Sequence, residues 1–155
     1  MILDSRVEFA DATSVAAVAG TALIGNVVDL ETARDIGSGE PLYFVVTIDT
    51  AVITGGSAGT ITLKLASDAQ AAIATDGSAT VHYASKAFVT DDTGEDLTAG
   101  LTAVVVAVPW EGAVYERYLG VLATIATTTV TAGKINAFLT KDPAKWKSYD
   151  APGQA

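Results

Sequence analysis

The chain has 155 residues, of which half are apolar, no cysteine, and a formal net charge of −9 at pH 7. A chain of this length buries roughly 70% of the surface that its unfolded form exposes, so one domain can fold without cross-links. The absence of cysteine excludes a disulfide framework and a thiolate metal site. The excess of acidic over basic residues, 18 against 9, opposes contact with nucleic-acid phosphates, so we expect no nucleic-acid partner.

Residues 1–25 are predicted to form an N-terminal arm. The stretch 12–25 (ATSVAAVAGTALIG) is apolar, but it is too short to span a bilayer, and acidic residues precede it where a signal peptide carries basic ones. We therefore expect a soluble protein with no membrane partner. The alanine-rich pattern of residues 12–24 fits a helix and a strand equally well. A strand is expected directly afterwards, near residues 26–30.

Strand signals dominate the middle of the chain. Residues 42–50 (LYFVVTIDT) form a β-branched and aromatic run that is typical of a buried strand. Residues 60–65 (TITLKL) alternate between apolar and polar side chains, as a half-exposed strand does. Further strands are expected over residues 78–89 and 101–109.

Two more alternating runs, near residues 118–125 and 135–140, are joined by a short stretch of threonine, alanine and glycine, which predicts a hairpin. Altogether we expect about seven strands and no long helix before Pro143. This pattern favours a single all-β domain, an antiparallel β-sandwich that is jelly-roll-like, over any βαβ arrangement. Residues 143–155 are predicted to form a short C-terminal tail.

The motifs that could indicate catalysis or metal binding do not match the patterns that these functions require. Residues 55–59 (GGSAG) match a nucleophile elbow, but strand signals flank them on both sides, and His82, the one histidine, follows too closely for a hydrolase. We interpret this motif as a hairpin loop. Residues 91–96 (DDTGED) could offer oxygen ligands to Ca²⁺, yet their spacing departs from the calcium-loop pattern, which indicates an exposed acidic loop. A lone histidine in a strand is typically a surface or hydrogen-bonded residue, and it cannot anchor a zinc site alone.

The two tryptophans allow two interpretations each. Trp110 follows Pro109 at the end of an expected strand, and Trp146 stands between two lysines in the C-terminal tail. Either side chain could cap the protein's own core. Either could instead anchor an interface, where tryptophan is enriched.

Several segments resemble, in order, the capsid cement or decoration proteins of short-tailed bacteriophages. They are MILD at the N-terminus, VVDLETARDIGSGEPLYFVV (27–46), YERYLGV (115–121), TAGKINAFLTKD (131–142) and Trp146. The stretches ARDIGSGEPLY and YERYL are the most specific parts of the resemblance. Residues 51–100 match by pattern only.

The resemblance implies a jelly-roll-like domain that forms a homodimer and sits on the outer surface of an HK97-type capsid, where it bridges neighbouring major capsid proteins. Such a protein is a structural part of the virion, made in the cytoplasm of the host bacterium. It is not an enzyme and needs no cofactor or metal. The large or charged residues of the matching segments are then the candidate interface residues: Arg34, Asp35, Glu40, Tyr115, Arg117, Tyr118 and Trp146.

Other interpretations stay open at this point. Arg34, Asp35, Glu116 and Arg117 could equally form internal pairs that fix loops. The protein could be a carbohydrate-binding jelly roll on a phage or cell surface. The candidates for that role are Tyr83, Trp110 and the DDTGED segment. A hydrolase that uses Ser57 is the third class.

Overall fold

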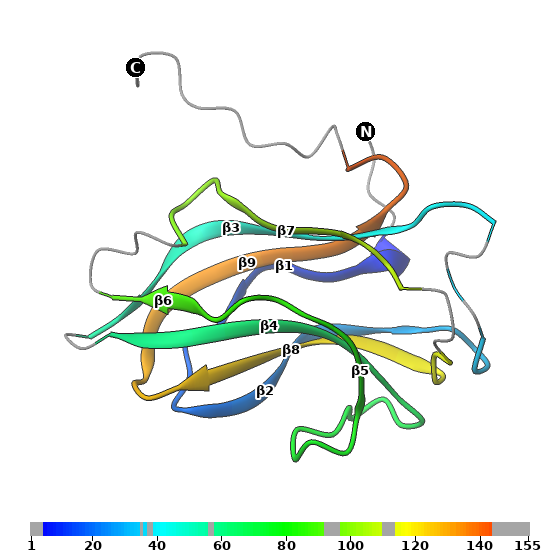
Figure 1. Ribbon diagram of the computed structural model, residues 1–155, viewed down its shortest axis with the longest axis horizontal. Helices are drawn as coiled ribbons and strands as arrows, with labels where there is room; N and C mark the ends of the chain where they lie inside the picture. The colour runs from blue at the N-terminus through cyan, green and yellow to red at the C-terminus, as the bar shows by residue number, and fades with distance from the viewer. Residues whose placement is uncertain are drawn as a thin grey trace.

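The computed structural model describes residues 5–34, 36, 39–55, 58–91, 97–109 and 114–143. Almost all of these residues belong to β-strands or to the short links between them (Figure 1). The elements in chain order are the 3-10 helix η1 (Ser5–Val7) and the strands β1 (Glu8–Ser14), β2 (Gly20–Asp29), β3 (Tyr43–Thr54), β4 (Gly59–Asp68), β5 (Thr80–Ala84), β6 (Phe88–Thr90), β7 (Thr102–Ala107), β8 (Tyr118–Ala126) and β9 (Val130–Thr140).

The strands form two antiparallel sheets that pack face to face. One sheet has the order β1-β9-β3-β7, and the other has the order β2-β8-β4-β5, with β6 also paired to β4. β5 and β6 pair with opposite halves of β4 and so fill one strand position between them. This strand order is that of a jelly roll, so the predicted antiparallel β-sandwich is confirmed.

The break between β5 and β6 has a local cause. The Ser85 hydroxyl oxygen accepts the Leu63 N–H at 3.0 Å and donates to the Lys86 carbonyl oxygen at 2.7 Å. A side chain therefore replaces a backbone acceptor of the ladder at this point. The single strand predicted over residues 78–89 becomes two strands for this reason.

The predicted N-terminal arm over residues 1–25 is wrong wherever the structure describes it. β1 pairs with β9 and β2 pairs with β8, so both strands belong to the sandwich. Phe9 and Val15 are fully buried in the core. The ambiguous stretch 12–24 is strand at both ends, because cross-strand pairing decides the structure of alanine-rich segments whose local preference is weak.

The predicted hairpin formed by residues 118–125 and 135–140 is also wrong. β8 pairs with β2 and β4, whereas β9 pairs with β1 and β3, so the turn between them joins the two sheets. β3 and β4, on either side of the glycine-rich loop at residues 55–59, likewise lie in different sheets. Alternation fixes which face of a strand is buried, but it does not identify the neighbouring strand.

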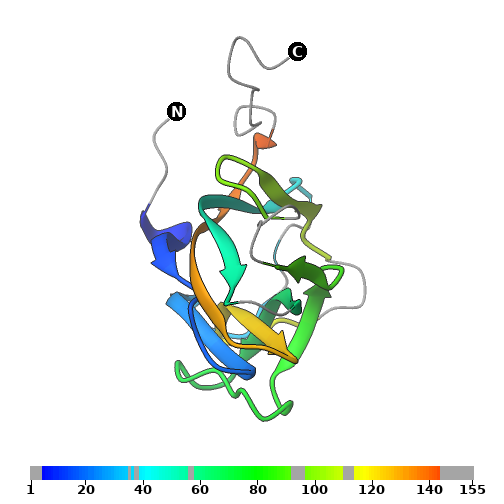
Figure 2. The ribbon, with the colours of Figure 1, turned by 90° about the vertical axis from the view of Figure 1, so that its left-hand side faces the viewer.

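Figure 2 shows the two sheets facing each other. The core between them is built mainly from valine, leucine, isoleucine and alanine. Three of its aromatic rings meet edge to face. Phe44 contacts Phe9 at 6.1 Å and Tyr83 at 6.3 Å between ring centroids. A second, smaller cluster lies outside the β2-β8-β4 sheet, where Ile73 from the β4–β5 link packs on Ala66 and Leu122.

Glycine permits one close approach at the edge where β1 and β2 come together. Gly25 in β2 has a positive φ of 67°, and a side chain there would collide with the Phe9 carbonyl oxygen. Only glycine combines this backbone conformation with the absence of a side chain. The residue therefore lets the two sheets close along this edge.

Candidate interaction surface

The two segments with the most specific resemblance lie side by side at one end of the sandwich. The Leu30 N–H donates to the Arg117 carbonyl oxygen at 2.8 Å, and the Arg34 N–H donates to the Tyr115 carbonyl oxygen at 3.1 Å. These bonds extend the β2–β8 ladder beyond its last pair, Asp29 with Tyr118. Residues separated by more than eighty positions in the chain are thereby fixed on one surface.

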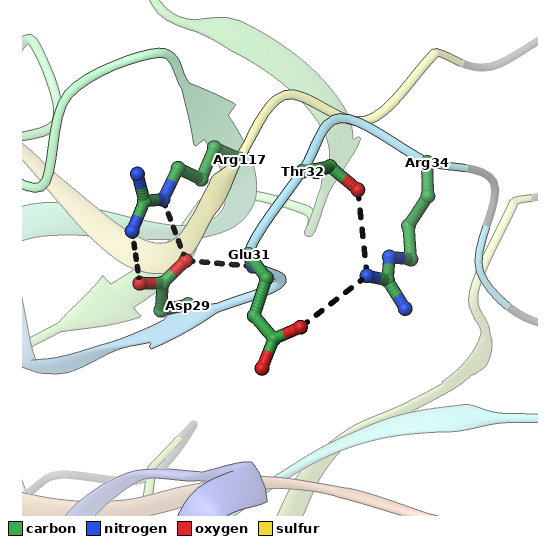
Figure 3. Close-up of polar contacts among 5 residues, drawn as sticks. All are labelled: Asp29, Glu31, Thr32, Arg34 and Arg117. Carbon is green, nitrogen blue, oxygen red and sulfur yellow. Dashed lines mark hydrogen bonds and ion pairs between the residues drawn. The ribbon is translucent and has the colours of Figure 1, made fainter.

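Asp29 and Arg117 form the central ion pair of this surface (Figure 3). The Arg117 Nε and Nη2 atoms donate to the two carboxylate oxygens of Asp29 at 2.9 and 2.8 Å, a bidentate geometry. The Glu31 N–H also donates to Asp29, at 2.7 Å. The hydrogen bond from Arg117, followed by that from Glu31, lowers the pKa of Asp29 to about 2. The pair keeps its charges at any ordinary pH.

Arg34 is held more loosely beside this pair. Its Nη2 atom lies 4.0 Å from a Glu31 carboxylate oxygen and 3.4 Å from the Thr32 hydroxyl oxygen, as Figure 3 shows. Half of its side chain is exposed to solvent. Arg34 can therefore turn toward a partner without breaking a short hydrogen bond, whereas Arg117 cannot.

Tyr118 and Tyr115 differ although both come from the YERYL segment. Tyr118 is half-buried, and the Arg117 guanidinium lies over its ring, 4.9 Å from the centroid. Tyr115 is fully buried, and its hydroxyl donates to the Pro109 carbonyl oxygen. The expectation that Tyr115 is a surface contact is therefore wrong, because its hydroxyl finds an internal acceptor and its ring joins the core.

Behind Tyr115 lies a small polar cluster at the edge of the core. The His82 ring stacks on Tyr115 at 3.8 Å, and its Nε2 atom is hydrogen bonded to the Ser67 hydroxyl at 2.7 Å. That hydroxyl oxygen also accepts the Glu116 N–H at 3.1 Å. Burial lowers the pKa of His82, and the charge of Glu116 opposes this shift. The prediction of a hydrogen-bonded histidine is confirmed.

This cluster places a serine beside a histidine, as nucleophilic catalysis requires, but its geometry does not suit that chemistry. Ser67 is fully buried, and its oxygen is already engaged by Glu116. A nucleophile must reach the reacting atom of a substrate. The cluster instead ties β4, β5 and the segment before β8 together.

Glu40 lies away from the arginines and pairs with Lys141 at 2.6 Å. Both side chains are about two thirds exposed. Next to them is a groove of about 530 Å³, whose lining includes Pro41, Tyr43 and Val108. A second groove of about 650 Å³ is lined in part by Asp29 and Glu31. The end of the sandwich is therefore both charged and grooved.

Several predicted features lie outside the described residues. These are Asp35, Trp110, Trp146, Ser57 and most of the DDTGED segment. Tyr83, a candidate for stacking on a sugar, is half-buried against Phe44. Within the described ranges, no helix has the length and apolar character needed to cross a bilayer. Nor do the residues that the structure describes contain a cluster of three or more side chains suited to holding a metal ion.

Sequence reasoning missed the partners of the arginines. Asp29 and Glu31 fall in a matching segment, but nothing in their spacing indicates that they meet Arg117 and Arg34. The one available signal was the strand-ending pattern Asp-Leu-Glu, since aspartate commonly accepts the N–H two residues later in a turn. This geometry does not identify the protein's family, but comparison with known proteins does.

The family model described as Bbp16 matches residues 9–139, which extend from β1 into β9. The chain belongs to the Bbp16 family. This family is phage-related, and the jelly-roll sandwich is therefore the fold of a phage-related protein. A search of curated proteins found no match.

Proposed function

We propose that this member of the Bbp16 family is a structural virion protein that binds the outer surface of an assembled HK97-type capsid and stabilises it by bridging major capsid proteins. The observation that carries the proposal is the meeting of residues 27–34 with residues 115–118 at one end of the sandwich. These are the residues that resemble cement proteins, and two backbone hydrogen bonds and an ion pair hold them in place. The phage-related family supports the same function.

The physical requirements of this function fit such a surface. A protein that binds the assembled shell and not its free subunits stabilises the shell by mass action. A homodimer carries two such sites, so moderate contacts combine into firm attachment. We assign the principal contacts to Arg34 and Tyr118, which the Arg117–Asp29 pair positions.

Heads stripped of this protein provide the test. Purified protein added back to them should sediment with the heads and raise the temperature or osmotic shock at which they release their genome. Bovine serum albumin at the same concentration serves as the control for nonspecific protection. Stripped heads that bind no protein, or that become no more robust when saturated with it, would contradict the proposal.

A further inference from the structure

β7 is an edge strand of its sheet. Among the described residues it pairs with β3 alone. The Val108 N–H donates to the Leu42 carbonyl oxygen at 2.8 Å, and hydrogen-bonded and non-hydrogen-bonded pairs alternate along an antiparallel ladder. The Val45–Val105 pair is therefore of the non-hydrogen-bonded kind. The N–H and carbonyl groups of Val105 thus point away from β3, toward the open edge.

The other sheet edges carry charges or interruptions that discourage pairing with another chain, whereas β7 carries no charge and its register shift with β3 lies at its start, between the Thr47–Thr102 and Val46–Val104 pairs. β1 bears Glu8 and Asp11 and is irregular in register at two points. β2 ends in Asp29, and its register with β8 shifts before Val28. The edge formed by β5 and β6 is interrupted between the two strands. Charges and irregularities of this kind are how proteins protect their sheet edges.

The sequence of β7, TAVVVA, contains no charged residue. Its register with β3 is regular over residues 104–107. The Val105 side chain is 49% exposed, although valine is typically buried in a sandwich. An uncharged and apolar edge that is regular around its exposed valine is the kind that pairs with another strand.

Charge decides which sheet edge two copies of the chain could share. Two copies of a chain with a net charge of −9 repel each other. A twofold contact also brings each surface against itself, so it must form where that surface has no charge of its own. β7 meets this condition, whereas β1 would place its carboxylates against their own copies.

We infer that β7 pairs antiparallel with β7 of a second copy, with Val105 opposite its own counterpart. The two sheets β1-β9-β3-β7 then join into one continuous sheet across the dimer axis. The inference rests on the homodimer of the proposed function and adds the strand that forms it. It leaves the charged end of each protomer free for the capsid.

A cysteine at the dimer axis tests this arrangement directly, because the natural chain has none. In a hydrogen-bonded antiparallel pair the Cα atoms are about 5.5 Å apart, within the range that a disulfide spans. Under oxidising conditions, Val105→Cys should therefore form a covalent dimer. A reductant should return this dimer to the monomer. Matched controls are Val18→Cys and Val81→Cys, whose native side chains are 72% and 47% exposed. Val105→Cys that stays monomeric, or controls that cross-link equally, would overturn the inference.

Val105→Lys provides a second, equilibrium test. Sedimentation equilibrium of the natural chain should give a dimer at tens of micromolar, and Val105→Lys should raise the dissociation constant at least tenfold, while Val18→Lys leaves it unchanged. If the natural chain is monomeric and Val105→Lys instead weakens binding to heads, β7 pairs with a capsid strand and the inference is wrong. A β7 dimer that fails to bind heads would contradict the proposed function alone.

Discussion

Asn136 shows how one side chain can support an irregular point of a neighbouring strand. Its Oδ1 atom accepts the Ala12 N–H at 2.7 Å, and its Nδ2 atom donates to the Thr47 hydroxyl at 3.3 Å. Ala12 has a positive φ of 42°, which is unusual for a residue with a side chain. The amide thus satisfies a backbone group that the β1–β9 ladder leaves unpaired.

Replacing this amide should destabilise the protein. Asn136→Ala leaves the Ala12 N–H without its acceptor, and we expect a loss of about 1–3 kcal/mol in the free energy of unfolding. Chemical denaturation measures it. Lys134→Ala, an exposed substitution on the same strand, should change the value by less than about 0.5 kcal/mol. Equal effects of the two substitutions would show that Asn136 does not support β1.

His82 predicts how stability depends on pH. Because burial lowers its pKa below the usual 6.5, the unfolded chain binds a proton at this position before the folded chain does. Stability should therefore fall as the pH drops below about 6.5 and continue to fall until the folded His82 titrates. Asp29 affects stability in a separate pH range. Its pKa is lowered from the usual 3.8 to about 2, so its contribution to stability is lost only as the pH falls between these two values.

Unfolding free energies measured from pH 7.5 to 5.5 test this dependence. The natural protein should lose stability across the range, and His82→Gln should show a flatter profile because it removes the titrating group. Identical slopes for the two proteins would exclude His82 as the source.

At the scale of elements, the alternation of side chains predicts the strands but not their partners. The run LYFVVTIDT correctly predicts β3, since β-branched and aromatic residues suit a buried strand wherever it pairs. The pairing of β9 with β3 and β1 depends on contacts between distant residues, which local periodicity does not encode. Sequence proximity therefore suggested a hairpin where the chain crosses between sheets.

Gly25 allows a test of how the β1–β2 edge closes. Gly25→Ala adds a side chain that collides with the Phe9 carbonyl oxygen, in a backbone conformation that also disfavours alanine. Gly77→Ala has a comparable positive φ but open space around it. We expect a loss of about 1 kcal/mol for Gly77→Ala and at least about 2 kcal/mol more for Gly25→Ala, measured by thermal unfolding. Similar losses of stability for the two substitutions would indicate that there is no close contact at Gly25.

At the scale of the whole molecule, the jelly roll brings distant segments to one end. Of the candidate interface residues taken from the resemblance, Arg34 and Arg117 lie on neighbouring segments at the surface, whereas Tyr115 is buried. An aromatic residue between two strands gives no sequence signal of whether its hydroxyl meets an internal carbonyl. Glu40 shares the loop with Arg34 yet pairs with Lys141, because the β3–β9 ladder sets its position.

Charge reversal at this end should affect binding and not folding. Arg34→Glu breaks only long contacts to Glu31 and Thr32 among the described interactions, so the melting temperature should change little. If Arg34 contacts the capsid, the affinity for stripped heads should fall at least about tenfold. Lys134→Glu introduces the same charge change on β9, away from this end's arginines in the chain, and should bind normally. Equal weakening by both substitutions would indicate general repulsion instead of a specific contact.

Electron cryomicroscopy of stripped heads resaturated with the protein would show where and how it binds. We expect added density on the outer surface of the shell, at boundaries between major capsid proteins, with residues 27–34 and 115–118 facing the shell. Heads without added density, or density that meets the shell through the opposite end at the turn of residues 127–129, would contradict this expectation.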